Sequence, residues 1–314
     1  MSLEDPVVIT CAISGALANR DQCPAIPYTP GEYAAEARRI VDEGGVHIHI
    51  HARKPDGTPS YEIEDFTAIH DAIRAEVGDA AILNFSTGTI GVSVEKRIEY
   101  LRACPPEVAA LNMGSMNYAK YSARRKDFVF STVFPNPFDE IIALLKAFDE
   151  LGIKPEHECF DLGHVGSLAP LIDMGVLDPP LHADFVMGVV GGVPPTARNL
   201  AAMADNLPEG VAAHWGVIGI SRVQWTLLAA ALSLGGSIRV GLEDNLYLPD
   251  GEMARSNGDL IAKARQMTVD AGRRAATVEE ARALLGLAER SPRGRGSGRQ
   301  LAQGLAPAAA ESSS

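Results

Sequence analysis

Short runs of apolar, β-branched residues alternate along this chain with longer amphipathic segments. The run at residues 6–13 has the composition of a strand, and a turn containing Ser and Gly follows it. Thr29, Pro30 and Glu32 then carry the start signal of a helix: an N-cap threonine, proline at the first position and the glutamate of a capping box. The helix is expected to run to about Glu43 and to lead into a second strand, which completes a β-α-β unit.

The same alternation continues to residue 271. After the first unit, the pattern predicts strands at 80–85, 108–112, 157–160, 185–190, 211–215 and 237–242. It predicts helices at 60–76, 93–103, 137–151, 167–174, 195–206, 221–234 and 258–271. About eight strands, each followed by a helix, favour an α/β fold with a parallel sheet, and so many units in ~250 residues favour a (β/α)8 TIM barrel. An open doubly wound sheet is the alternative, but the first strand-to-helix turn lacks its GxGxxG pattern.

Two segments stand outside this regular pattern. Residues 127–134 form an extra extended segment within the long connection that follows the strand at 108–112. From Ser291 onward the composition changes to Arg, Gly, Ser, Ala and Gln, which is typical of disorder. We therefore expect a single barrel domain at residues 1–290 and a disordered C-terminal tail at 291–314.

The second strand, within residues 44–53, ends on histidines. Side chains two apart on a strand share a face, so His47, His49 and His51 project one way while Ile48 and Ile50 project into apolar packing. Neutral imidazole is a common metal ligand, and two or three imidazoles that converge at a strand end suit Zn²⁺. The alternative is a polar strand face that happens to carry histidine.

Composition and charge narrow the class of protein. The chain has 314 residues, of which 46% are hydrophobic and 22% charged, as is ordinary for a globular protein with a full core. Its formal net charge of −12 argues against nucleic acid and anionic membranes as partners. The four cysteines form no CxxC pair, no apolar run is long enough to span a bilayer, and the N-terminus lacks a signal-peptide pattern. We expect a cytoplasmic protein.

In a barrel of this kind, catalytic groups gather where the strands end. Most predicted strand ends carry polar or small residues that a purely structural end does not need. Small side chains and backbone N–H groups at strand ends can hold a carboxylate or an anionic intermediate, and the candidates are Ser86, Thr87, Gly88, Asn112, Gly114 and Ser115. Glu158 ends another strand. His164 and His214 lie near strand ends too, where a catalytic group and a satisfied core histidine both remain open, whereas Trp215 and Trp225 fit the core.

The last predicted strand carries the most informative polar residues. Glu243 follows it and is the natural third metal ligand, because two histidines and one carboxylate leave a zinc position open for substrate. The alternative for Glu243 is a solvated acid in a loop. Arg239 lies in an apolar strand where a guanidinium needs a carboxylate partner, and Asp244 is the candidate. The same ligand set also accepts Mn²⁺, Fe²⁺ or Co²⁺.

Four stretches of this chain, taken together, resemble the β-keto acid cleavage enzyme family. They are residues 48–57 with the His-x-His pair, 84–88, 160–164 and 239–245. The similarity covers nearly the whole chain to about Leu287 and includes the less diagnostic stretches 191–196 and 254–258. The combination is specific, although no single stretch is.

The resemblance implies a zinc-dependent barrel, in a homotetramer, that converts a β-keto acid and acetyl-CoA into acetoacetate and a new acyl-CoA. The implied ligands of one zinc ion per subunit are His49, His51 and Glu243. The implied unit that activates the substrate for enolate formation comprises Arg239, Asp244 and Ser86. The chemistry of these residues agrees with the implied reaction, because a proton on the carbon next to a ketone becomes acidic when the keto oxygen binds a Lewis acid.

This chain departs from the family pattern at two positions. His47 stands where the family usually has an aliphatic residue, and we take it as a neighbour of the metal site because it lies deeper in the barrel. Leu17 stands where members that use an amine substrate have a glutamate, and leucine cannot pair with an ammonium group. Glu158 matches a second family glutamate that faces that amine. We therefore expect a neutral or apolar β-keto acid as substrate.

The main alternative from another class is a zinc-dependent amidohydrolase-like hydrolase on a TIM barrel. That class also has His-x-His on a strand and an acid after the last strand, but its pair lies on the first strand. Here an apolar strand precedes the histidines. A non-catalytic ligand-binding barrel is the other alternative, and it leaves the Arg239–Asp244 pair unexplained.

Overall fold

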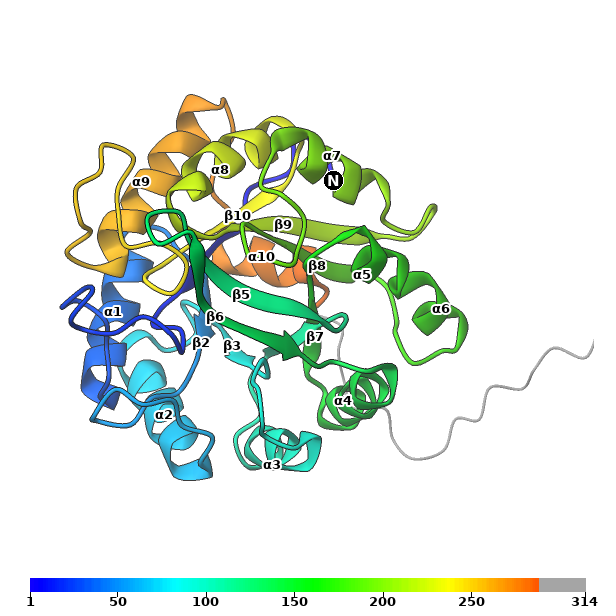
Figure 1. Cartoon of the computed structure of the whole chain (residues 1–314), viewed down its shortest axis with the longest axis horizontal. Helices are drawn as coiled ribbons and strands as arrows, with labels where there is room; N and C mark the ends of the chain where they lie inside the picture. The colour runs from blue at the N-terminus through cyan, green and yellow to red at the C-terminus, as the bar shows by residue number, and fades with distance from the viewer. Residues whose placement is uncertain (288–314) are drawn as a thin grey trace, which may run out of the picture.

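A computed structural model of the protein describes residues 1–287 as a closed barrel of eight parallel strands (Figure 1). The strands are β1 (Ile9–Ala12), β2 (His47–Ile50), β3 (Ile82–Ser86), β4 (Val108–Asn112), β7 (Lys154–Cys159), β8 (Leu181–Met187), β9 (Ala213–Gly219) and β10 (Ser237–Val240). They follow one another around the barrel in chain order, and β10 closes against β1. The predicted α/β class and (β/α)8 barrel are therefore confirmed.

Helices connect the strands and surround the barrel. They are α1 (Pro30–Asp42), α2 (Ile63–Val77), α3 (Val94–Ala103), α4 (Phe138–Leu151), α5 (Leu162–Gly166), α6 (Leu168–Asp173), α7 (Ala197–Asp205), α8 (Gln224–Ser233), α9 (Asn257–Asp270) and α10 (Val278–Leu285). The predicted capping box at the start of α1 is present, with Thr29 as N-cap and Glu32 reaching back to the Thr29 N–H at 2.8 Å. None of the helices within residues 1–287 combines the length and apolarity that crossing a membrane requires.

The apolar core lies mainly between the outer face of the barrel and the helices. Outward-facing strand residues such as Ile48, Ile50 and Phe85 are fully buried there against helix residues such as Phe66 and Tyr100. Trp215 and Trp225 belong to this core, as predicted. A second apolar cluster closes the opposite end of the barrel from the site, where α10 packs on the first residues of the strands. The core therefore holds each strand end in a defined place.

A two-stranded hairpin projects from the connection between β4 and α4 and lies across the barrel opening (Figure 1). Its strands are β5 (Met116–Ser122) and β6 (Asp127–Phe134), which pair antiparallel with a register shift at Lys120/Tyr121. The extended segment predicted at 127–134 matches β6. The pattern did not predict β5, because its polar and aromatic residues carry no clear apolar period and its pairing with β6 is a tertiary contact.

Several predicted boundaries were wrong by a few residues. The strand predicted at 185–190 begins at Leu181, and the one predicted at 211–215 extends to Gly219. His214 therefore lies near the start of β9 and not near its end. The helix predicted from residue 60 begins at Ile63, because the Ser60 hydroxyl bonds Asp65 and occupies the turn before the helix. The domain boundary predicted at residue 290 and the tail at 291–314 lie outside the described residues.

Candidate active site

Two strand ends bring the histidine pair and Glu243 together. His49 and His51 project from the end of β2 with ring centroids 5.2 Å apart. Glu243 follows β10, and its backbone N–H donates to the Ala12 carbonyl at 3.2 Å, which ties this loop to β1. His49 Nε2 lies 3.8 Å from Glu243 Oε2, and His51 Nε2 lies 3.5 Å from Glu243 Oε1. Barrel closure thus assembles the three predicted ligands.

Gly15 makes room for Glu243 at this point. Its φ is +60°, and a Cβ there would lie only 2.6 Å from Glu243 Cγ and 3.2 Å from Glu243 Cα. The left-handed backbone and the close approach both require glycine. The Ser14-Gly15 turn predicted after the first strand therefore positions the carboxylate that the sequence pairs with the histidines.

The three side chains fit a divalent metal ion. Ligands bonded tetrahedrally at about 2.1 Å lie roughly 3.4 Å from one another, close to the distances between Glu243 and the two imidazoles. Within residues 1–287, Glu243 Oε2 is buried and accepts no hydrogen bond. Burial opposes ionisation of Glu243, but His51, Arg239 and His49 hold its pKa well below the usual range, and burial lowers the pKa of His49. An ionised carboxylate and a neutral imidazole are the forms that bind metal.

Arg239 is the centre of a buried ion network beside the three ligands. Its guanidinium donates two hydrogen bonds to Asp244, from Nε to Oδ2 at 2.9 Å and from Nη2 to Oδ1 at 3.1 Å. Nη1 donates to Glu158 Oε1 at 3.1 Å, and Nη2 also donates to Glu243 Oε1 at 2.9 Å. The predicted Arg239–Asp244 pair is confirmed. One cation thus faces three carboxylates.

Burial, together with the neighbouring carboxylates, raises the proton affinity of Asp244 and Glu158. Burial raises the pKa of Asp244 to about 7, Arg239 acts against that rise, and the nearby Glu243 adds to it. Burial likewise raises the pKa of Glu158, again opposed by Arg239. The same carboxylates raise the pKa of Arg239 even though its burial alone lowers it. Arg239 therefore remains a cation, while Asp244 is able to exchange a proton near neutral pH.

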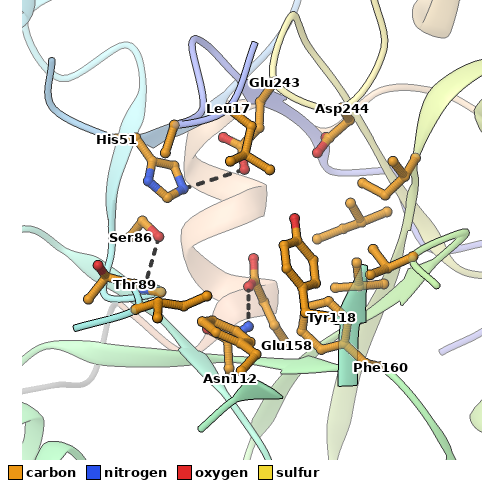
Figure 2. A pocket seen from close by; sticks show the side chains of 18 of the residues that line it. Leu17, His51, Ser86, Thr89, Asn112, Tyr118, Glu158, Phe160, Glu243 and Asp244 are labelled. Atoms are coloured by element: carbon orange, nitrogen blue, oxygen red, sulfur yellow. Dashed lines mark hydrogen bonds and ion pairs between the residues drawn. The ribbon is translucent and has the colours of Figure 1, made fainter. Parts of the chain in front are cut away.

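A cavity of about 370 Å³ opens directly above these groups (Figure 2). Its floor is polar and comprises His51, Ser86, Asn112, Glu158, Arg239, Glu243 and Asp244. Its walls are mostly apolar and comprise Ala16, Leu17, Pro59, Tyr61, Ile90, Tyr118, Phe134, Phe160, Val186, Val189, Ile218 and Ile220. A small molecule with one polar and one apolar end suits such a cavity.

Four of the small and polar strand-end candidates line this cavity. Ser86 Oγ accepts a hydrogen bond from the Gly88 N–H at 3.2 Å, and Asn112 Nδ2 donates to Glu158 Oε2 at 3.2 Å. Both hydrogen bonds are drawn in Figure 2, where the side chains face the interior. The strand ends of β3, β4 and β7 therefore contribute to the polar floor.

Three other candidates do not line the cavity. Thr87 is one residue along the strand from Ser86 and points the opposite way, so its hydroxyl donates to the Ala110 carbonyl at 2.5 Å. Ser115 Oγ accepts from the Asn136 N–H at 2.7 Å, within the connection to α4. Gly114 packs against His164, whose ring would lie 2.5 Å from a Cβ there. The structure thus places Gly114 and Ser115 behind the site.

The remaining histidines lie away from the cavity. His164 Nδ1 accepts from the Phe160 N–H at 3.2 Å, which makes it a support for the loop after β7. His47 is fully buried below the site, with Nδ1 3.0 Å from Thr10 Oγ1. His214 packs against His182 deeper in the barrel, with ring centroids 5.8 Å apart. Burial and the neighbouring His182 lower the pKa of His214 to about 3.

Sequence reasoning missed most of the cavity walls. Tyr118 and Phe134 come from the hairpin, and Figure 2 shows the Tyr118 ring directed into the cavity. The Thr89 hydroxyl donates a hydrogen bond to the Tyr61 hydroxyl at 2.7 Å, and both residues line the cavity. These residues lie in loops or in a strand without apolar alternation, so nothing in their local pattern marks them. Only the number of aromatic residues between 118 and 134 hinted at a covered site.

The chain is similar to curated proteins over nearly its whole length. The chain is 35% identical over 283 residues to the 3-keto-5-aminohexanoate cleavage enzyme of Fusobacterium nucleatum subsp. nucleatum, covering 90% of this chain and 98% of that protein. It is 34% identical over 305 residues to the 3,5-dioxohexanoate:acetyl-CoA acetone transferase of Paraburkholderia graminis, covering 91% of this chain and 97% of that protein.

Comparison with solved structures supports the fold. The apo structure of ObcA superposes with a TM-score of 0.71 and 21% identity, over 84% of this chain. The chain spans 66% of the length of ObcA. The sequence profile of the β-keto acid cleavage enzymes matches residues 6–287, which are nearly all of the described chain. This protein therefore belongs to the β-keto acid cleavage enzyme family.

Proposed function

We propose that this protein transfers an acyl group from a β-keto acid to CoA at the expense of acetyl-CoA, giving acetoacetate and a new acyl-CoA. Family membership supports this reaction, and relatives are named as acetyl-CoA-dependent transferases. The observation that carries the proposal is that two adjoining units lie at the floor of one cavity, which His51, Glu243, Arg239 and Asp244 line. One unit is the His49, His51 and Glu243 set, and the other is the Arg239–Asp244 pair.

The metal we propose is zinc, one ion per subunit, held by His49, His51 and Glu243. Two imidazoles and one carboxylate leave a position open for an oxygen of the substrate. When bound, the ion supplies a Lewis acid that makes the proton between the keto and carboxylate groups more acidic. The unpartnered Glu243 Oε2 supports an ion at this place.

The second unit moves the proton. Asp244 accepts the proton from the carbon between the two carbonyl groups, and its bidentate pairing with Arg239 holds the carboxylate in one orientation. The resulting enolate carbon attacks the thioester carbonyl of acetyl-CoA and releases the CoA thiolate. That thiolate then attacks the original keto carbon, so the bond to the former α-carbon breaks and the enolate of acetoacetate is released. Asp244 returns its proton to the enolate carbon, and acetoacetate leaves. Atoms and charge balance without an oxidant or reductant.

Other cavity residues position the substrate. We assign Ser86 to this activating unit, because its hydroxyl faces the cavity and already holds the Gly88 N–H. Asn112 and Glu158 form the neighbouring part of the cavity floor. The sequence also suggested substrate-binding roles for Thr87, Gly114 and Ser115. These residues do not line the cavity, so we expect them only to hold the backbone around it in place.

The substrate side chain we propose is neutral and apolar. Leu17 lies at the cavity and is 68% exposed, so it can contact a ligand. Glu158 is bound by Arg239 and Asn112, which leaves it unsuited to pair with a substrate ammonium. We expect Leu17→Glu to raise kcat/KM for a β-keto acid with an amino group, relative to an alkyl analogue, by about tenfold. Leu17→Gln, of similar size but uncharged, is the control and should leave that ratio unchanged.

We further propose a homotetramer in the cytoplasm. The hairpin also exposes Val129 and Val133, which a neighbouring subunit could cover. Cys11, Cys23, Cys104 and Cys159 are all free and buried, which suits a reducing compartment. Sedimentation of the purified protein measures the assembly.

The test of the reaction mixes zinc-loaded protein with acetyl-CoA and a panel of β-keto acids, and assays acetoacetate and the new acyl-CoA. Glu243→Gln and Arg239→Ala should both abolish product formation. Glu252→Gln, which removes the same charge from an exposed loop, is the matched control and should retain it. Hydrolysis of amides or lactones without transfer to CoA would instead support the amidohydrolase-like alternative and contradict the proposal.

A further inference from the structure

The tip of the hairpin is strongly basic in an acidic protein. Lys120, Arg124, Arg125 and Lys126 are all exposed and lie within seven positions, whereas the whole chain has a formal net charge of −12. Asp127 is the one acid in this stretch, and its carboxylate accepts the Phe128 N–H at 2.8 Å. None of the four cations forms an ion pair with a carboxylate of residues 1–287. Four unpaired cations at a loop tip form an electrostatic site for an anion.

Three arginines in loops on the same side of the barrel already have partners within the protein. Arg20, in the connection after β1, lies 2.6 Å from Glu32, and Arg255, in the connection after β10, lies 3.1 Å from Asp259. Arg53 donates to backbone carbonyls, including that of Gly15 at 2.8 Å. The hairpin tip differs from these three arginines because its four cations form no ion pair within residues 1–287.

The hairpin links this charge to the cavity. Tyr118 lines the cavity, and Lys120 follows two positions later on the same face of β5. Strand β5 ends at Ser122, four residues beyond Tyr118 and roughly 14 Å further at about 3.4 Å per residue. Arg124, Arg125 and Lys126 follow at the turn. The basic side chains thus form a line that leads outward from the cavity.

This spacing fits acetyl-CoA, the co-substrate of the proposed reaction, on which the inference rests. Between its sulfur and its first phosphorus, CoA has about thirteen backbone bonds, as many as four to five residues of extended chain, or roughly 15 Å. With the thioester in the cavity beside Tyr118, the phosphates of CoA reach the end of β5. We propose that Lys120, Arg124, Arg125 and Lys126 bind the diphosphate and 3′-phosphate of acetyl-CoA.

Exposed aromatic rings beside the tip suit the adenine. Tyr121 and Phe128 pair across the hairpin with ring centroids 5.8 Å apart, and they are 50% and 48% exposed. Phe130, opposite Lys120 in the register, is also exposed. Aromatic side chains next to cations are the usual surface for a base that carries phosphates. The hairpin therefore offers partners for both ends of the nucleotide.

The test compares two thioesters in the transfer assay. Acetyl-CoA carries the phosphates, and S-acetyl-pantetheine has the same thioester and arm without them. In the variant Arg124→Glu, Arg125→Glu, Lys126→Glu, we expect KM for acetyl-CoA to rise about tenfold or more. KM for S-acetyl-pantetheine and kcat with both thioesters should stay unchanged. The control variant, Arg102→Glu, Lys146→Glu, Arg265→Glu, makes the same charge change on exposed helix positions and should behave like the wild type.

Direct binding separates this inference from the proposed reaction. Calorimetry with CoA and with 3′,5′-ADP as probes should show binding to the wild type and a loss of about tenfold or more in the tip variant. If the wild type transfers acyl groups but the tip variant keeps its KM, the inference is overturned and the reaction stands. An equal rise in KM for both thioesters, or an equal rise in the control variant, also overturns it. A wild type that neither transfers acyl groups nor binds CoA overturns both.

Discussion

Replacing Arg239 by methionine tests the buried ion network most directly. The change keeps much of the side-chain volume but removes the only cation that donates to Asp244, Glu158 and Glu243 within the described chain. Breaking a buried ion pair by removing one partner costs about 3–5 kcal/mol, because the other charge stays buried and unpaired. We expect the free energy of unfolding to fall by about that amount at pH 8, with metal removed by a chelator.

The loss of stability in Arg239→Met should become smaller as the pH falls. Arg239 lowers the pKa of both Asp244 and Glu158 against the effect of burial, so its removal raises both pKa values further. The folded variant then binds more protons than the folded wild type, while the unfolded chains are equivalent. Each additional proton bound stabilises the folded variant by up to about 1.4 kcal/mol per pH unit as the pH falls. The difference in free energy of unfolding between the wild type and Arg239→Met should therefore narrow by about 1–3 kcal/mol between pH 8 and pH 6.

Urea unfolding followed by circular dichroism at pH 8 and pH 6 measures this difference. Arg273→Met is the matched control, because Arg273 is also buried but donates only to backbone carbonyls, including those of Gly236 at 2.6 Å and Asp5 at 2.9 Å. The control should lose stability by an amount that does not change between the two pH values.

Two results would refute this reasoning. One is a loss of less than about 1 kcal/mol for Arg239→Met at pH 8, which would mean that solvent or rearrangement compensates the three carboxylates. The other is a stability difference that stays constant or widens toward pH 6. Either result would also remove the basis for treating Asp244 as a base oriented by Arg239.

Three further predictions follow from the same structure. Glu243→Gln should lower zinc affinity by at least about tenfold, because it removes the charged ligand of the set, and equal zinc content in dialysed wild type and variant would contradict this. Gly191→Ala should release the hairpin, because a Cβ there would lie 1.8 Å from the Asn117 carbonyl oxygen at a φ of +109°. Trypsin should then cleave the variant faster after Arg125, and unchanged cleavage would count against the contact. His214 has a folded pKa of about 3 against about 6.5 unfolded, so it withholds a proton on folding and costs the wild type about 2 kcal/mol of stability from pH 7 to pH 5. His214→Phe should remove that part of the loss, as measured by urea unfolding at both values, and an unchanged slope would disprove it.

Local features of the sequence were sufficient to predict the barrel and to propose His49, His51 and Glu243 as metal ligands, which the fold brings together. The capping box at Thr29 and Glu32 and the alternation through His49 and His51 depend only on neighbours within a few residues, so both can be read without the fold. The order of strands and helices then leaves few possible topologies, because a connection between two parallel strands through a helix is almost always right-handed. The Arg239–Asp244 pair could also be predicted from the sequence, because a buried charge without a partner is costly in free energy.

The tertiary structure alone decided what surrounds those residues. Glu158 joins Arg239 because β7 and β10 face one another across the closed barrel, a contact that spans 81 positions and has no local signal. Ser86 faces the cavity while Thr87 faces away, because a single step in register reverses a side chain. The hairpin, its Tyr118 and its basic tip depend on the pairing of β5 with β6. Sequence periodicity determines which face of an element is apolar, but the closure of the barrel determines which faces meet.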